Sequence, residues 1–201
     1  MSLCRALIAV LSGIILGSLS VSAHAIPQQG PTGNFYDFVP GSFSWTDART
    51  GALGLSHLGQ PGFLATVTSS AEDAFLATLA PLGWLGGTDQ PLEGTWKWAD
   101  GPEANQTFWL GGPGGSAPSG IYTNWGPGNP DNGGGNQNFL LRGPGGWDDF
   151  NGTQGYYVEF LTPEPTTLLL FGTTAAGLGL ARWRARPRKQ EAAKTSAALY
   201  E

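Results

Sequence analysis

Glycine and tryptophan crowd into the same part of this chain: 20 of its 32 glycines and six of its eight tryptophans lie between Gly83 and Gly155. Glycine is unfavourable inside helices and strands because it loses the most conformational freedom on folding. Tryptophan contributes a large apolar surface that a fully solvated chain cannot bury. The pattern predicts an aromatic core with short strands and long loops. It argues against disorder and, because no Gly-X-Y period exists, against collagen.

Residues 1–25 are typical of a secretory signal peptide. Arg5 precedes an apolar run over 6–19, and the Ala-His-Ala of residues 23–25 fits a cleavage site. The alternative is a short buried helix of a cytosolic protein, but the run lacks an amphipathic pattern. The single cysteine, Cys4, would leave with this segment. We therefore expect an exported domain that folds without disulfides.

A three-part pattern covers residues 163–201. Pro163-Glu164-Pro165 is followed by an apolar span over 166–181 and by a tail rich in arginine. The span reaches about 24 Å as a helix, a little short of a roughly 30 Å hydrocarbon core. The basic tail predicts a cytoplasmic end, with the preceding domain on the other side of the membrane.

This order resembles the PEP-CTERM sorting signal of Gram-negative bacteria. The resemblance implies transient residence in the inner membrane, then recognition and cleavage by an exosortase. Release to the cell surface or to an extracellular exopolysaccharide matrix would follow. The alternative is an ordinary single-span anchor that is never processed.

Residues 26–162 form the expected single domain, and their charge is strongly unbalanced. They contain three basic and twelve acidic residues, a formal net charge of −9. Such a domain lacks the basic surface that nucleic-acid binding requires. Its surplus carboxylates make a hard cation a more suitable partner.

Hydrophobic spacing predicts an α+β domain with two early helices. The first is expected over 43–55, and the second from a Ser69 or Ser70 cap to Leu79, with Ala74, Phe75 and Leu76 among its core-facing residues. Short strands are expected at 34–39, 63–67, 83–87, 94–99, 139–142 and 155–161. Long Gly-rich loops fill 111–120 and 126–135, and loops of that length in a compact domain are usually functional or disordered.

Oxygen-bearing side chains gather late in the domain, in Asn124–Asn132 and in Trp147-Asp148-Asp149. Calcium takes six to eight oxygen ligands, and Asp131, Asp148 and Asp149 with nearby amides would supply most of them. Zinc is disfavoured because one histidine and no cysteine remain after residue 25. The alternative is that these Asn, Asp and Gly residues only build turns.

The order of motifs over residues 33–161 resembles that of the C-type lectin-like domain. The motifs are FLATV with S..E..F (63–75), WLGG (84–87), W.W..G (96–101), NW..GNPDN (124–132), WDD (147–149) and Y..E (156–159). The resemblance implies an α+β fold of two helices, short antiparallel strands and a long loop region. Within it, WLGG and Trp96/Trp98 are expected in the core.

The resemblance also implies a calcium site that takes sugar hydroxyls. Carried over by position, its metal ligands are Asn129, Asp131, Gln137, Asp148 and Asp149, and the first four also contact sugar. The Asn129-Pro130 peptide is implied to be cis. Three positions depart from the family pattern: Asn129 is shorter than the usual Glu or Gln, Gln137 lacks a charge and Asp148 gains one. The glycines at 133–135 leave Asn136 or Asn138 open as alternatives to Gln137.

The sequence therefore predicts an exported, non-enzymatic surface or matrix protein that binds carbohydrate, such as exopolysaccharide, through calcium. The alternative is a calcium-independent module of the same fold that serves protein contacts or matrix structure. Hydrolysis is disfavoured because the adjacent Asp148 and Asp149 alternate faces and no hydrolase motif surrounds them.

Overall fold

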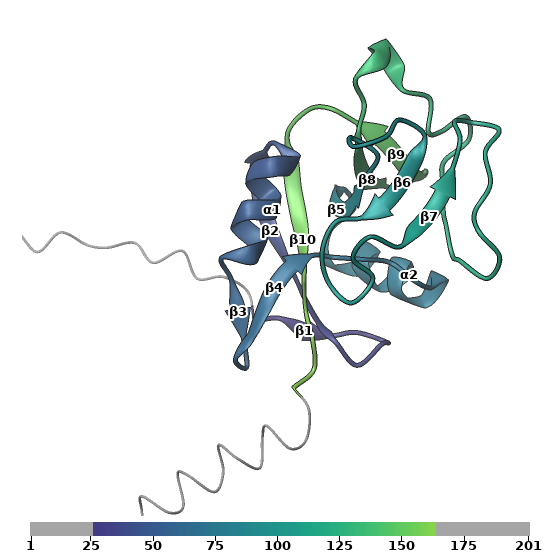
Figure 1. Cartoon of the computed structure of the whole chain (residues 1–201). Coiled ribbons are helices and arrows are strands. Elements are labelled where there is room, and N and C mark those ends of the chain that lie inside the picture. Colours follow the sequence, from purple (N-terminus) through teal and green to yellow (C-terminus); the bar gives the residue numbers. More distant parts are fainter. Residues whose placement is uncertain (1–25, 164–201) are drawn as a thin grey trace, which may run out of the picture.

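A computed structural model of the chain describes residues 26–163 (Figure 1). The expected signal peptide, Glu164-Pro165 of the sorting motif, and the span over 166–181 lie outside the described residues. Among residues 26–163, no helix is long and apolar enough to cross a membrane.

The described residues form the expected α+β fold, with two helices and one mixed sheet. The helices are α1 (Trp45–Leu53) and α2 (Ser70–Leu79), and a 3-10 turn, η1, covers Gly133–Gly135. The strands are β1 (Gln28–Gln29), β2 (Phe35–Phe43), β3 (Ser56–His57), β4 (Gln60–Leu64), β5 (Gly83–Thr88), β6 (Thr95–Trp98), β7 (Thr107–Leu110), β8 (Phe139–Gly143), β9 (Gly146–Phe150) and β10 (Gln154–Phe160).

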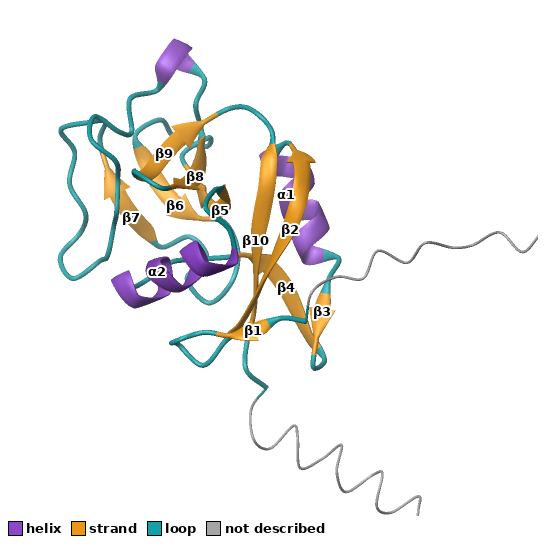
Figure 2. Ribbon diagram, turned by 180° about the vertical axis from the view of Figure 1, so that it is seen from behind, coloured by secondary structure: helices purple, strands orange, loops and turns teal. Residues whose placement is uncertain are grey.

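Strand β10 joins the two parts of the sheet (Figures 1 and 2). It pairs antiparallel with β2 and β4, beside α1, and parallel with β5 through Tyr156 and Trp84. From β5 the sheet continues to β6 and β7 on one side and to β8 and β9 on the other. The long segment between β7 and β8 extends from this second part, with η1 at its tip.

Helix α2 begins where the sequence indicates and packs Phe75, Leu76 and Leu79 against the core as expected, but its inward face also includes acidic residues. The Ser69 Oγ accepts a hydrogen bond from the Glu72 amide and caps the helix. Leu76 is fully buried, as expected, whereas Ala74 is exposed. Glu72 and Asp73 are buried instead, since both make polar contacts with the sheet that hydrophobic spacing cannot reveal.

Strands β1, β3, β7 and β9 were not expected, and strand β4 is placed differently from the expected 63–67. Strand β4 begins at Gln60 and includes Gly62, where a Cβ would lie 2.7 Å from the Ala52 carbonyl oxygen of α1. The absence of a side chain thus allows helix and strand to approach closely. Asp148 and Asp149 lie inside one of the unexpected strands, β9, which forms a hairpin with β8.

The aromatic core is confirmed. Trp84, Trp96, Trp98 and Trp147 are at most 2% exposed. Trp98 stacks on Phe108 with ring centroids 4.4 Å apart, and Trp147 packs edge-on against both rings. Such aromatic pairs stabilise the fold beyond the contribution of buried apolar area. Residues 26–163 contain no cysteine, so this part of the chain depends on such packing rather than on disulfides.

A second feature of the interior is a pair of buried carboxylates, Glu72 of α2 and Glu159 of β10. The Tyr36 hydroxyl donates to Glu72 at 2.6 Å and lies 3.3 Å from Glu159. Asn34 and Thr66 donate to the oxygens of Glu159. Burial, with the nearby charge of Glu72, raises the pKa of Glu159 to about 7.

Replacing Gly86 by alanine should destabilise the domain, because the new Cβ would lie 2.7 Å from the Leu64 carbonyl oxygen. We expect a loss of about 1–3 kcal/mol in the free energy of unfolding, measured by urea titration. Gly114→Ala is the matched control, since no atom lies within 4 Å of its added Cβ. Equal stability of the two variants would contradict this account of β5 packing.

The raised pKa of Glu159 predicts that stability falls as pH rises from about 4.5 to about 7. In that range the folded state keeps a proton that the unfolded state has lost, so acid favours folding. Glu159→Gln should flatten this part of the stability–pH profile, which has an amplitude of up to about 3 kcal/mol. Chemical unfolding at pH 4.5, 6 and 8 would check this, and an unchanged slope would contradict it.

Candidate functional site

The expected ligand positions lie on two segments that contact each other, the loop before β8 and the strand β9. The Trp147 amide donates to the Asn124 carbonyl at 2.6 Å, and the Gly126 amide donates to the Trp147 carbonyl at 2.8 Å. The Trp125 ring packs against Trp147 and Trp96. The loop is thus fixed along β9 by backbone hydrogen bonds and by the aromatic core.

Asp149 is the buried centre of this region, with no exposed surface. Its Oδ1 accepts from the Asp131 amide at 2.9 Å, and its Oδ2 accepts from the Asn132 amide at 2.5 Å. Two hydrogen bonds from consecutive backbone amides hold both oxygens of this carboxylate in place. Asp149 therefore fixes the loop residues that follow Pro130.

Asp131 and Gln137 meet at the tip of the loop. The Gly133 amide donates to the Asp131 Oδ1 at 3.0 Å and also to the Gln137 Oε1. The Gln137 amide in turn donates to the Asn132 side chain at 3.0 Å. Turn η1 between them is compact, with Gly134 and Gly135 at positive φ.

Asn129 and Asp148 complete the expected set. The Asn129-Pro130 peptide bond is cis, as implied by the resemblance. The Asn129 Nδ2 lies 3.5 Å from the Trp147 carbonyl oxygen, which brings this side chain to β9. Partial burial, followed by the charges of Asp149 and Asp131, raises the pKa of Asp148. The structure thus brings all five positions to one end of the domain.

A further acid, Asp89, was missed by the sequence reasoning. It follows β5, is 1% exposed, and accepts from the Gly94 amide through Oδ2, while its buried Oδ1 has no hydrogen-bond partner. Burial, then Glu93 and Asp149, raises its pKa to about 6, against the effect of the Gly94 amide. The available signal was the position of Asp89, two residues after WLGG and four residues before Glu93.

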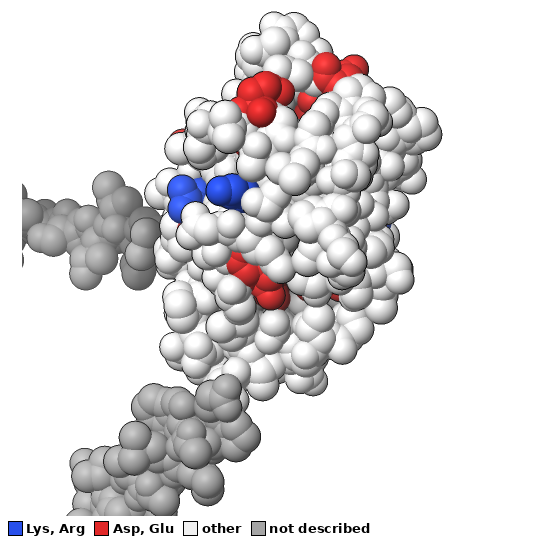
Figure 3. Space-filling view, turned by 45° about the vertical axis from the view of Figure 1, so that its right-hand side comes forward, with Lys and Arg blue, Asp and Glu red and all other residues white. Residues whose placement is uncertain are grey.

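The loop acids lack nearby basic partners. Among residues 26–163, the ion pairs join Arg49 to Asp100 and Arg142 to Asp73. Figure 3 shows a largely uncharged face with acidic side chains at its upper end, a second acidic patch lower down, and basic side chains between them. Within the same residues, no three His, Cys, Asp or Glu side chains are arranged to hold a metal by themselves. A cation here would need amide and backbone oxygens as well.

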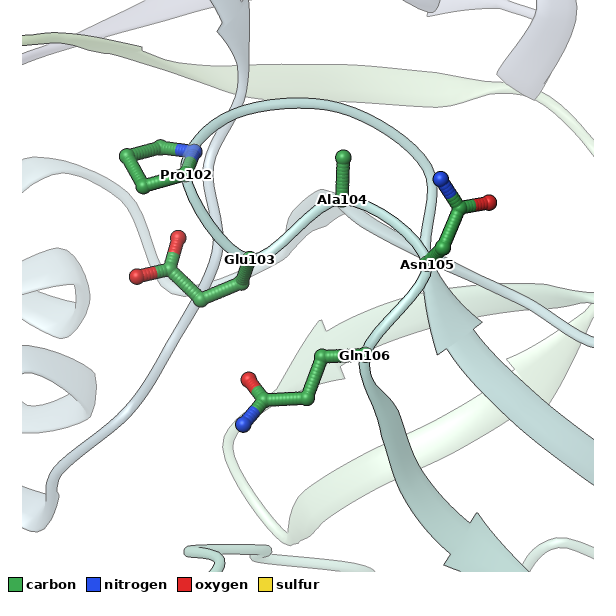
Figure 4. Close-up of a pocket in the computed structure, with 5 residues that line it drawn as sticks. All are labelled: Pro102, Glu103, Ala104, Asn105 and Gln106. Atoms are coloured by element: carbon green, nitrogen blue, oxygen red, sulfur yellow. The ribbon is translucent and has the colours of Figure 1, made fainter.

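Two adjoining surface hollows, of about 480 and 270 Å³, lie elsewhere. The first is formed by the loop Pro102–Gln106, from which Glu103 and Gln106 project to the same side (Figure 4). The second adds Thr68, Trp98 and Tyr122. Neither includes an expected calcium ligand, so the candidate site is an open loop surface and not a pocket.

Comparison with known proteins identifies the fold and the terminal motif. Residues 57–158, about half of the chain, match the lectin C-type domain. The chain belongs to the C-type lectin domain family. Residues 161–186 match the PEP-CTERM protein-sorting motif, which implies an exported, cell-surface protein processed by an exosortase. C-type lectin domains are binding domains and not enzymes, in agreement with the expectation from the sequence.

Relatives share this C-type lectin domain within much longer proteins. The chain is 39% identical over 102 residues to halomucin of Haloquadratum walsbyi, covering 50% of this chain and 1% of halomucin. It is 39% identical over 83 residues to mouse C-type lectin domain family 4 member F, covering 38% of this chain and 14% of that protein. The alignments thus span a small part of these relatives.

Solved structures support the same fold. The C-type carbohydrate-recognition domain of cow CD23, crystallised in the presence of a GlcNAc2Man3 oligosaccharide, has a TM-score of 0.53 at 26% identity. The match covers 70% of this chain and 99% of that one. The C-type lectin CEL-I of Cucumaria echinata has a TM-score of 0.50 at 22% identity, covering 65% and 91%, and shows the fold alone.

Loss of charge at Asp149 should destabilise the metal-free protein, whereas loss of charge at Asp148 should not. In Asp149→Asn the new side-chain NH₂ would face one of the two backbone N–H groups that now donate to Asp149. We expect this to lower the free energy of unfolding by about 1–3 kcal/mol. Asp148→Asn should leave stability unchanged or raise it, because it relieves repulsion from Asp149 and Asp131. Thermal unfolding in EDTA compares them, and equal destabilisation would contradict these roles.

Proposed function

We propose that this C-type lectin domain binds carbohydrate through a calcium ion at the loop end of the domain, in a protein displayed at the cell surface. Asn129, Asp131, Gln137, Asp148 and Asp149 would hold the ion. Calcium would supply a Lewis-acidic centre with open coordination positions for a pair of sugar hydroxyls. The protein itself would orient the ligand oxygens toward the ion and keep basic side chains away from them.

The observation that carries this proposal is the uncompensated acidity of the loop end. Asp148 has its pKa raised by burial and by Asp149 and Asp131, and the buried Asp89 Oδ1 lacks a partner. Like charges held together by a fold destabilise it unless a counter-ion is present. A ligand set that consists of carboxylate and amide oxygens suits calcium in particular.

The chemistry of the ligand follows from the same geometry. The open loop surface favours a polymer or terminal sugar over a small molecule that needs enclosure. Export through the PEP-CTERM motif would place the domain where extracellular polysaccharide is available. Exopolysaccharide is therefore the proposed ligand class.

Asp131→Asn tests the calcium site with little disturbance of the fold, because the residue is exposed and its amide oxygen can still accept from Gly133. We expect calcium affinity, measured by calorimetry, to fall at least about tenfold as one ligand charge is lost. Asp47→Asn, on α1, is the charge-matched control and should bind like the unaltered protein. Absence of calcium uptake by the unaltered chain would overturn the proposal.

A glycan array probed in calcium and then in EDTA tests the sugar function. Binding that disappears on chelation and in Asp131→Asn supports the proposal. The second candidate is a calcium-independent contact module, favoured by the hydrogen bonds that Asp149 and Asn132 make within the loop region. Binding to glycan or to a protein partner that survives EDTA would favour that candidate instead.

A further inference from the structure

Asp73 lies at the junction of helix, sheet and loop, although neither the family motifs nor the ligand set includes it. It is 3% exposed in the first turn of α2. Its Oδ1 accepts from the Arg142 Nε of β8 at 2.7 Å, and Arg142 is itself 7% exposed. Its Oδ2 accepts from the Tyr122 hydroxyl at 3.2 Å and from the Asn124 side-chain amide.

Asn124 continues this set of contacts into the candidate site. Its side chain is held by Asp73, while its carbonyl accepts from the Trp147 amide at 2.6 Å. The Trp147 carbonyl accepts from Gly126, and the Gly126 carbonyl accepts from the Asn129 amide at 3.1 Å. An uninterrupted series of hydrogen bonds thus runs from α2 to the first expected ligand position.

We propose that Asp73 and Arg142 are positioning residues for the ligand loop, acting through Asn124 to hold residues 124–129 against β9 before any ion binds. The role in calcium binding rests on the proposed function, whereas the ordering of the loop does not. Asp73 suits this task because helix α2 and strand β8 fix it from two sides.

The physical need arises from the composition of the loop. Between β7 and β8 the chain contains ten glycines, so its unanchored form has many conformations and ordering them costs free energy on binding. An anchor that orders the loop in advance removes that cost from the binding step. The buried ion pair, in turn, fixes the carboxylate, because neither partner can leave without stranding a charge.

The experiment uses the whole chain in a mild detergent and compares Asn124→Ala with Gln106→Ala. Asn124 is exposed, so its truncation removes the contact to Asp73 without opening the core, and Gln106 is an exposed amide outside the loop. In EDTA, hydrogen exchange at the Trp147 and Gly126 amides should quicken about tenfold in Asn124→Ala only. Calcium affinity should weaken by about the same factor.

Charge exchange adds a readout that a merely structural role would not produce. Asn124→Asp places a second carboxylate beside Asp73 and should weaken calcium binding further than Asn124→Ala, whereas Asn124→Gln, which keeps an amide donor and leaves the Asp73–Arg142 pair intact, should retain part of the affinity. Unchanged exchange at both amides in Asn124→Ala overturns the inference. If the unaltered chain takes up no calcium, the proposed function fails, and the exchange rates alone decide the positioning role.

Discussion

The aromatic cluster of Trp96, Trp98, Phe108, Trp125 and Trp147 is the contact on which the rest of the structure depends. Strands β6, β7 and β9 and the long loop contribute to it, and no disulfide closes that loop in residues 26–163. Trp125 is the critical member, because it brings the loop to Trp147, whose backbone then pairs with residues 124 and 126. Burial of large rings thus takes the place of covalent closure.

With the loop fixed to β9, the carboxylates at its end determine the charge of this surface. Burial and neighbouring negative charges raise the pKa of two carboxylates, Asp89 and Asp148. Asp149, by contrast, is satisfied by two backbone amides. The domain therefore combines a carboxylate that organises the loop with others that remain electrostatically uncompensated, an arrangement that favours a cation.

The two helices, six of the ten strands and the core tryptophans were accessible from the sequence because each depends on local spacing or on a run of motifs. Interior polar contacts were not. Neither Glu72 nor Asp73 was expected in the interior, yet they contact Tyr36 and Arg142, which lie 36 and 69 residues away respectively. Asp89 was missed for a similar reason, since its burial results from the β5–β8 pairing.

By itself, the sequence determined the α+β class, the glycine-rich loop region, the terminal motifs and the residue types around a candidate calcium site. These follow from composition, periodicity and short patterns, which are properties of neighbouring residues. The tertiary structure alone decided which acids are buried, which of them share a charge environment, and how Asp73 connects helix α2 to the loop. Those properties depend on distances between residues far apart in the chain, which only folding sets.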